Sequence, residues 1–190
     1  MPMPTIARRP TLILVLAASL IGCSSQPPAD VAQVSPDSAD AATAVEPIPA
    51  PTDAVVLRIG GAVSNGNDGD RLLFDLPTLE DLPMRTVTIT EPFLNQEMEF
   101  TGVQMDDLMT VAGADESAST ITTTALDDYV IDIPMDLVER GSVLLATRAD
   151  GDAIAIQDGG PIRIIFLGDS DFELNTDNWI WSVTTMKVVG

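Results

Sequence analysis

Few residue types in this sequence are able to do chemistry. The 190 residues include no histidine, and the one cysteine is Cys23. These absences exclude histidine-based acid–base catalysis, Ser-His-Asp and Cys-His nucleophile systems, ordinary zinc sites and an intramolecular disulfide. Any chemistry must therefore use carboxylates, arginines, hydroxyls, the single Tyr129 or a bound cofactor.

Two arginines are candidates for binding a ligand. Arg163 lies inside the apolar run Ile162–Phe166, and Arg148 follows the apolar run that ends near Thr147. A buried charge is costly unless it is paired, so each arginine needs a partner. For Arg163 an ion pair with one of the many carboxylates is favoured over direct ligand binding, and Arg148 leaves the same two alternatives open.

Aromatic side chains near the end of the chain form a second candidate group. Trp179 and Trp181 are two residues apart, which on a strand places them on one face. With Tyr129 they would make an aromatic platform for a ligand, although large aromatic residues more often fill a core. The neighbouring Asp127 and Asp128 fit a loop better than an acid–base pair, because adjacent residues on a strand point to opposite faces.

Charge limits the classes of partner. Asp and Glu number 29 against 9 Lys and Arg, which gives a formal net charge of −20. A surface this negative repels phosphate backbones, so we expect no nucleic-acid binding. It also disfavours docking on anionic headgroups, and a solvated acidic surface is the simplest interpretation.

The first 22 residues are typical of an export signal. Arg8 and Arg9 precede an apolar stretch, Leu12–Ile21, which is too short to span a bilayer comfortably. Leu20-Ile21-Gly22-Cys23 resembles the bacterial lipobox, in which the cysteine is acylated. The alternative is a short membrane anchor with an incidental cysteine. The Arg8-Arg9 pair also raises the twin-arginine route, but its flanking residues favour general secretion.

Lipidation at Cys23 predicts the location of the protein. It implies an exported protein anchored through its N-terminal lipid to the cell envelope, on the periplasmic face. Ser24 after the cysteine indicates the outer membrane. Residues 23–53 are rich in proline, alanine and aspartate and have no apolar periodicity, which predicts a disordered linker. Residues 54–190 then form one domain.

Short strands dominate the pattern within residues 54–190, with a few short helices, so the sequence predicts an α+β fold. Thr101–Gln104 resembles a capping box for a helix whose apolar face is Met105, Leu108, Met109 and Ala112, ending at Gly113. The expected strands are 55–59, 85–90, 120–125, 129–133, 143–147, 153–156, 162–167 and 179–189. Further short helices are expected at 76–82 and 134–139. The loop from Asn65 to Asp70 lacks the ligands of a calcium loop and is interpreted as a turn.

The order of motifs resembles a known family. The stretches that carry the resemblance are Phe100–Val103, Asp107–Met109, Ala112-Gly113, Ala125–Val130, Ile133-Pro134, Leu144–Gly151, Gly159–Arg163 and Trp179–Trp181. Together they are similar to a shortened molybdopterin-binding domain of the sulfite oxidase family. The resemblance covers nearly all of residues 54–190 and implies a largely antiparallel, barrel-like mixed sheet with short helices. It also matches Arg163 to the family's arginine after Gly-x-Pro.

Departures from the family pattern bear on function. Catalytic members ligate molybdenum with a cysteine thiolate, and Thr90 or Glu91 stands at that place here. The family's histidine before the Gly-x-Pro-x-Arg motif is missing, and its lysine beside tryptophan corresponds to Ile180. A hydroxyl or carboxylate does not replace a soft thiolate without changing the metal chemistry. Few basic residues remain to receive the anionic phosphate of the cofactor.

The sequence therefore predicts an envelope lipoprotein with a degenerate molybdopterin-binding-like domain, without a catalytic residue or bound cofactor. We expect it to bind a small anionic ligand or an envelope protein partner, with Arg163, Arg148, Tyr129, Trp179 and Trp181 as candidate site residues. The alternatives are a molybdopterin-dependent oxidoreductase with an atypical metal ligand, and a structural envelope lipoprotein. Fold resemblance alone supports the oxidoreductase alternative.

Overall fold

The computed structural model describes residues 47–190. The expected export signal, Cys23 and most of the expected linker lie outside these residues. The last part of that linker, from Pro47 to Asp53, packs on the domain: Ile48 contacts the core, and the backbone N–H groups of Thr52 and Asp53 donate to Asp75. Among the described residues, no helix is long and apolar enough to cross a membrane.

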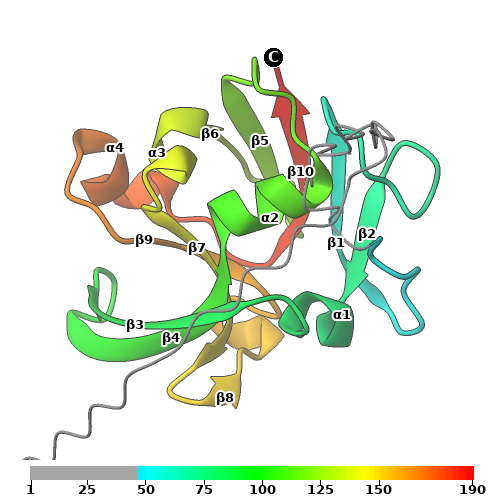
Figure 1. Cartoon of the computed structure of the whole chain (residues 1–190). Helices are drawn as coiled ribbons and strands as arrows, with labels where there is room; N and C mark the ends of the chain where they lie inside the picture. The colour runs from blue at the N-terminus through cyan, green and yellow to red at the C-terminus, as the bar shows by residue number, and fades with distance from the viewer. Residues whose placement is uncertain (1–46) are drawn as a thin grey trace, which may run out of the picture. The chain divides into compact units, whose positions relative to one another are not determined.

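Two five-stranded sheets carry the fold (Figure 1). The first sheet has the order β2-β1-β10-β5-β6, formed by β1 (Val55–Gly61), β2 (Leu72–Asp75), β5 (Thr120–Ala125), β6 (Val130–Pro134) and β10 (Val183–Val189). Its pairs are antiparallel except β1 with β10, which run parallel. Alternation of buried and partly exposed residues along β5 matches a strand with one face in the core.

The second sheet is antiparallel and has the order β3-β4-β7-β8, with β9 paired to β7. Its strands are β3 (Met84–Glu91), β4 (Gln96–Gln104), β7 (Val143–Ala149), β8 (Asp152–Ala153) and β9 (Arg163–Phe166). The α+β class and the largely antiparallel mixed sheet are thus confirmed. Within residues 47–190 the strands form two sheets, and neither closes on itself as a complete barrel.

Short helices join the strands. They are α1 (Leu76–Glu80), α2 (Met105–Ala112), α3 (Met135–Glu139) and α4 (Asp171–Leu174), with two single-turn 3₁₀ helices at Ile156–Asp158 and Thr176–Asn178. Helix α2 contacts β4, β7 and α3 and buries its four predicted apolar residues in the main core. Gly113 ends α2 with a φ of 63°, the left-handed conformation that glycine adopts without a side-chain clash.

The hydrophobic core has two parts. The main cluster lies among the first sheet, the helices and one face of the second sheet. A smaller cluster of Phe100, Leu144, Ala146, Ile154 and Ile165 lies on the other face of the second sheet. Since Ala146 pairs with Arg163, this second cluster surrounds the arginine that the sequence singled out.

Several sequence-based expectations were wrong. The expected strand 153–156 is reduced to β8 at Asp152–Ala153, because the backbone after it turns on itself, with the N–H groups of Asp158 and Gly160 donating to Ala155. Thr101–Gln104 belongs to β4, a strand that was not predicted, and Gln104 caps α2 without a side-chain hydrogen bond. The last strand begins at Val183, so Trp179 and Trp181 precede it rather than sharing a strand face. The backbone between Trp179 and Ser182 does not continue the pairing of β10 with its neighbouring strands. Instead the N–H of Ser182 donates to the carbonyl of Gly159, and the carbonyl of Ile180 accepts from the N–H of Ile164.

Candidate functional site

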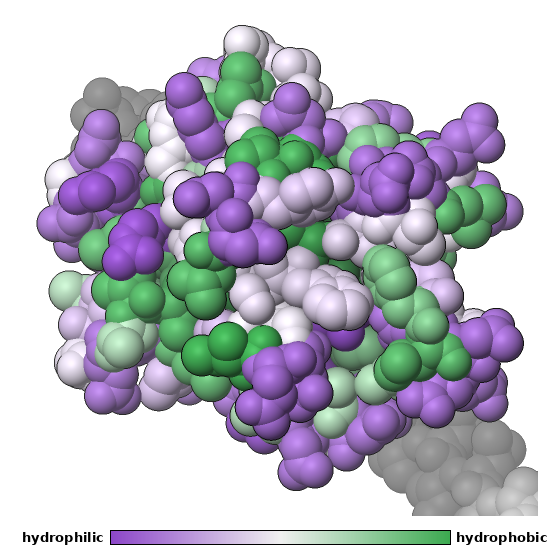
Figure 2. Space-filling view, turned by 180° about the vertical axis from the view of Figure 1, so that it is seen from behind, coloured by the Kyte–Doolittle hydropathy of each residue, from purple (hydrophilic) through white to green (hydrophobic). Residues whose placement is uncertain are grey.

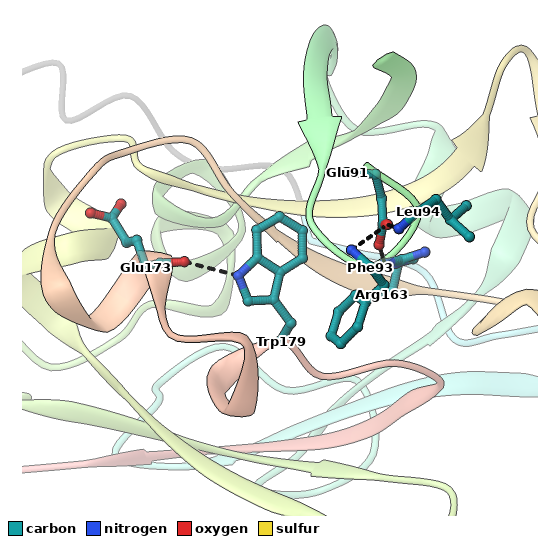
Figure 3. A network of polar contacts seen from close by, with 6 residues as sticks. All are labelled: Glu91, Phe93, Leu94, Arg163, Glu173 and Trp179. Carbon is teal, nitrogen blue, oxygen red and sulfur yellow. Dashed lines mark hydrogen bonds and ion pairs between the residues drawn. The ribbon is translucent and has the colours of Figure 1, made fainter. Parts of the chain in front are cut away.

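A buried ion pair joins the end of β3 to the start of β9. The Arg163 Nη2 atom lies 3.0 Å from Glu91 Oε1, and the two side chains are 6% and 1% exposed. The second carboxylate oxygen of Glu91 accepts hydrogen bonds from the backbone N–H groups of Phe93, at 2.8 Å, and Leu94, at 2.7 Å (Figure 3). The ion pair that the sequence favoured for Arg163 is confirmed, and both oxygens of its carboxylate are occupied.

Aromatic rings enclose the Arg163 guanidinium. Its central carbon lies 4.7 Å from the centre of the Trp181 ring and 5.3 Å from that of Phe100, distances at which a cation is attracted to a ring. Burial lowers the pKa of Arg163, although the hydrogen bond and charge of Glu91 act in the opposite direction. The buried Nε atom has no hydrogen-bond partner among residues 47–190.

Trp181 lines more than one hollow on the surface. One, of about 310 Å³, is lined by Phe93, Tyr129, Trp179 and Trp181 together with Asp127 and Asp177. Another, of about 360 Å³, includes Arg163 in its lining, along with several apolar residues and the acidic residues Glu91, Asp152 and Asp158. Figure 2 shows apolar side chains reaching the surface among hydrophilic ones on one face of the molecule.

Hydrogen bonds inside the protein hold the aromatic residues of the first hollow. The hydroxyl of Tyr129 donates to the carbonyl of Asp177 at 2.6 Å. The Trp179 indole N–H donates to the carbonyl of Glu173 at 2.9 Å, as Figure 3 shows. Phe93 meets Trp181 edge to face, with 5.1 Å between the ring centres. The structure therefore brings Tyr129, Trp179 and Trp181 together, as the sequence predicted, although through loops instead of strand spacing.

Helix α4 positions the carbonyl that holds Trp179. Ser170 and Glu173 form a capping box at its start, with the Ser170 hydroxyl donating to Glu173 at 2.6 Å. Burial acts to raise the pKa of Glu173, but hydrogen bonds from Ser170 and Ser142 and the charge of Arg140 together hold that pKa below its usual value. The buried carboxylate of Glu173 is thus stabilised in its charged form.

Arg148 lies apart from this site. It forms an ion pair with Glu80 of α1, with a distance of 2.7 Å between Nη2 and Oε2. Its neighbour Ala149 lines the hollow beside Arg163, and adjacent strand residues point to opposite faces, so Arg148 points away from that hollow. The structure does not bring the two candidate arginines together.

Sequence reasoning missed two parts of the site. It named Thr90 or Glu91 as standing where a thiolate belongs, but it did not identify Glu91 as the partner of Arg163, which is 72 residues away along the chain. It also missed Phe93, whose exposed ring follows directly after β3. The available signal was an aromatic residue in the loop after a strand, beside a proline. Asp127 lies in a turn, as expected, and lines the aromatic hollow.

Comparison with known proteins places this arrangement in a family. A model described as "Oxidoreductase molybdopterin binding domain" matches residues 47–173, about two thirds of the chain. The chain belongs to the oxidoreductase molybdopterin-binding domain family. No curated protein matches the sequence.

A solved structure supports the fold of this family for the chain. It is the sulfane dehydrogenase SoxCD from Paracoccus pantotrophus, with a TM-score of 0.56 and 21% sequence identity. The match covers 70% of this chain and 37% of that one, so the chain spans little more than a third of the SoxCD chain. At this identity the likeness shows the fold alone.

The described residues do not fit the family's cofactor as catalytic members hold it. Residues 47–190 include no cysteine or histidine, and no group of three or more possible metal-ligating side chains was found among them. The unpartnered Nε of Arg163 would suit an anion, but Glu91 already neutralises that arginine. Asp152 and Asp158 line the same hollow and would repel the cofactor's phosphate.

Proposed function

We propose that this protein is a binding lipoprotein of the cell envelope, in which the molybdopterin-binding-domain fold serves recognition without molybdenum catalysis. The observation that carries the proposal is the state of Glu91 at the end of β3, which with Thr90 is one of the two residues that stand where catalytic members have their thiolate. Its two oxygens accept from Arg163 and from two backbone N–H groups, and its side chain is 1% exposed. A metal would have to displace all three donors to reach it.

Charge supports recognition of something other than an anion. Of the two candidate arginines, Arg163 is paired with Glu91 and Arg148 with Glu80. The hollow beside Arg163 carries Asp152 and Asp158 as well. An anionic ligand would meet repulsion there, so we favour the protein-partner form of the sequence expectation, or a cationic ligand, over the small anion.

Metal and pterin analysis tests the proposal. The full-length chain is expressed in a host that makes the molybdenum cofactor, beside a catalytic member of the family as a loading control. We expect substoichiometric molybdenum, no pterin fluorescence and no reduction of sulfoxides from this chain, while the control loads. Stoichiometric molybdenum with turnover would establish the alternative, an oxidoreductase with an atypical metal ligand.

The envelope location rests on the sequence around Cys23. Mass spectrometry of the mature N-terminus should find a lipid-modified Cys23, and fractionation should place the protein with the outer membrane. Cys23→Ala should abolish membrane association and leave the melting temperature of the domain unchanged, because Cys23 precedes the first strand of the domain by about 30 residues along the chain. An unmodified Cys23, or cleavage elsewhere, would contradict this location.

A further inference from the structure

The hollow lined by Phe93, Tyr129, Trp179 and Trp181 gathers an unusual share of the chain's aromatic residues. The sequence has five phenylalanines, two tryptophans and one tyrosine, and half of these eight side chains line this one hollow. Phe93 and Tyr129 are 48% and 45% exposed, and Trp181 is 38% exposed. Exposed aromatic residues concentrated in one concave place are typical of a recognition site.

Most polar groups of these aromatic residues are already used within the protein. Tyr129 and Trp179 donate their hydrogen bonds to backbone carbonyls, and the backbone N–H of Phe93 donates to Glu91. The hollow therefore offers ring surfaces, the Trp181 indole N–H, the Thr176 hydroxyl and carboxylates to a ligand. A sugar or another ligand that needs many directed hydrogen bonds would find few partners there.

The charge of the hollow is negative. Asp127 and Asp177 line it, no arginine or lysine does, and neither aspartate takes part in an ion pair among the described residues. Aromatic rings attract cations through their negative faces, and carboxylates add to that attraction. Trp181 already holds one cation in this way, since Arg163 lies 4.7 Å from its ring centre.

We propose that this hollow binds a small organic cation of the methylated ammonium class. A quaternary ammonium group carries a positive charge but no hydrogen-bond donor. It can therefore be bound by ring faces and carboxylates in a hollow that offers few hydrogen-bond partners. The volume of about 310 Å³ is at the lower end of the range for small-ligand pockets. This proposal deepens the binding role proposed above and rests on it.

Intrinsic fluorescence offers a site-specific test. Both tryptophans of the chain line the hollow, so tryptophan emission reports on binding there. Because Trp181 also borders the Arg163 hollow, the variants below, changed at Asp177 and Tyr129, distinguish the two places. The full-length chain in detergent is titrated with choline, and with 3,3-dimethylbutan-1-ol, a neutral molecule of the same shape, at constant ionic strength. We expect saturable binding of choline, confirmed by calorimetry, with an affinity at least about tenfold higher than that of the neutral molecule.

Variants connect the binding to the residues. Asp177→Asn removes a carboxylate but keeps the backbone carbonyl that holds Tyr129, and Tyr129→Leu removes one ring; each should weaken choline binding about three- to tenfold. Glu116→Gln is the matched control, because it removes one negative charge from the loop before β5, whereas the hollow lies beyond the other end of that strand. It should leave binding unchanged. Melting curves show whether each variant is folded.

The competing outcomes are distinct. Equal binding of the neutral molecule, or no saturable choline binding by the folded parent, overturns the proposal. Binding of short lysine peptides without choline would identify a docking site for a basic protein segment instead and also overturns it. Molybdenum content, measured on the same preparation, tests the proposed binding role separately from these titrations.

Discussion

The two arginine–glutamate pairs anchored on the second sheet differ mainly in their surroundings. Arg163 and Glu91 are 6% and 1% exposed, whereas Arg148 and Glu80 are 40% and 20% exposed. Burial lowers the pKa of Arg163, whereas the hydrogen bond that Arg148 donates to Glu80 raises the pKa of Arg148. The same sheet thus anchors one arginine–glutamate pair in apolar surroundings and another in contact with water. Only the loss of the buried pair should lower the free energy of unfolding substantially.

Breaking the buried pair should have the largest effect. Arg163→Ala leaves Glu91 charged and buried, so we expect a loss of about 3–5 kcal/mol in the free energy of unfolding. Arg163→Lys should recover only part of this, because an ammonium lacks the planar fork that lies over Trp181 and Phe100. Urea unfolding at neutral pH measures both variants. If they unfold like the parent, the pair is not buried in solution.

Removing both charges sharpens the comparison. A buried ion pair replaced by apolar side chains of similar size is often nearly neutral in stability. Here Glu91 also accepts from the N–H groups of Phe93 and Leu94, which would lose their acceptor. We therefore expect Glu91→Leu with Arg163→Met to be more stable than Arg163→Ala, but less stable than the parent. A double-mutant cycle with both single variants measures the coupling. Full recovery would show that the two backbone bonds contribute nothing.

The buried pair also shows how much of the site could be predicted from the sequence. Arg163 within an apolar run required a partner, but with 29 acidic residues to choose from, nothing local identified Glu91. By contrast, α2 was predictable because its apolar spacing and the left-handed Gly113 are local signals. At Gln96–Gln104 the sequence was misinterpreted, because Thr101–Gln104 resembles a helix capping box although it belongs to a strand. The segment Trp179–Ser182 was misassigned because its backbone hydrogen bonds go to residues distant in sequence. Local patterns thus predicted most elements, while the site depended on contacts between distant segments.

Asp75 is buried like Glu91 and Glu173, and it forms no ion pair among the described residues. Its oxygens accept from the N–H groups of Thr52, Asp53 and Thr78, and its side chain is nearly unexposed. The hydrogen bonds from Thr78, with those from Asp53 and Thr52, hold the pKa of Asp75 far below its usual range. A carboxyl whose pKa is depressed by folding stabilises the fold above its unfolded pKa, near 3.8, and this contribution is lost as the pH falls toward the folded value.

Asp75→Asn should therefore destabilise the domain at neutral pH, by less than Arg163→Ala and more than Arg148→Ala. An amide has one acceptor oxygen where the carboxylate uses two, so it does not satisfy the N–H groups on both sides. As the pH falls below the unfolded pKa near 3.8, the difference from the parent should shrink, because the unfolded parent takes up a proton at Asp75 while the folded parent still holds the carboxylate. Denaturant unfolding between pH 2 and 7 checks this, with the exposed Asp169→Asn as a matched control. A difference that is constant with pH would contradict the assignment.

Arg148→Ala should have the smallest effect on stability at neutral pH, because partly exposed ion pairs gain little over hydration.

The pH dependence of the Arg148→Ala variant is still informative. Burial alone would raise the pKa of Glu80, but the hydrogen bond and charge of Arg148, together with a hydrogen bond from Thr147, hold it below its usual 4.5. In the parent this contribution is present above pH 4.5 and is lost as the pH falls. Without Arg148, most of what lowers the pKa of Glu80 is lost, so that pKa should rise and the ionisation of Glu80 should stabilise the fold less. The stability difference between parent and variant should thus be greatest near pH 7 and vanish at low pH, as NMR titration of Glu80 with unfolding curves would show. A Glu80 pKa that stays low in the variant would mean that Arg148 does not control it.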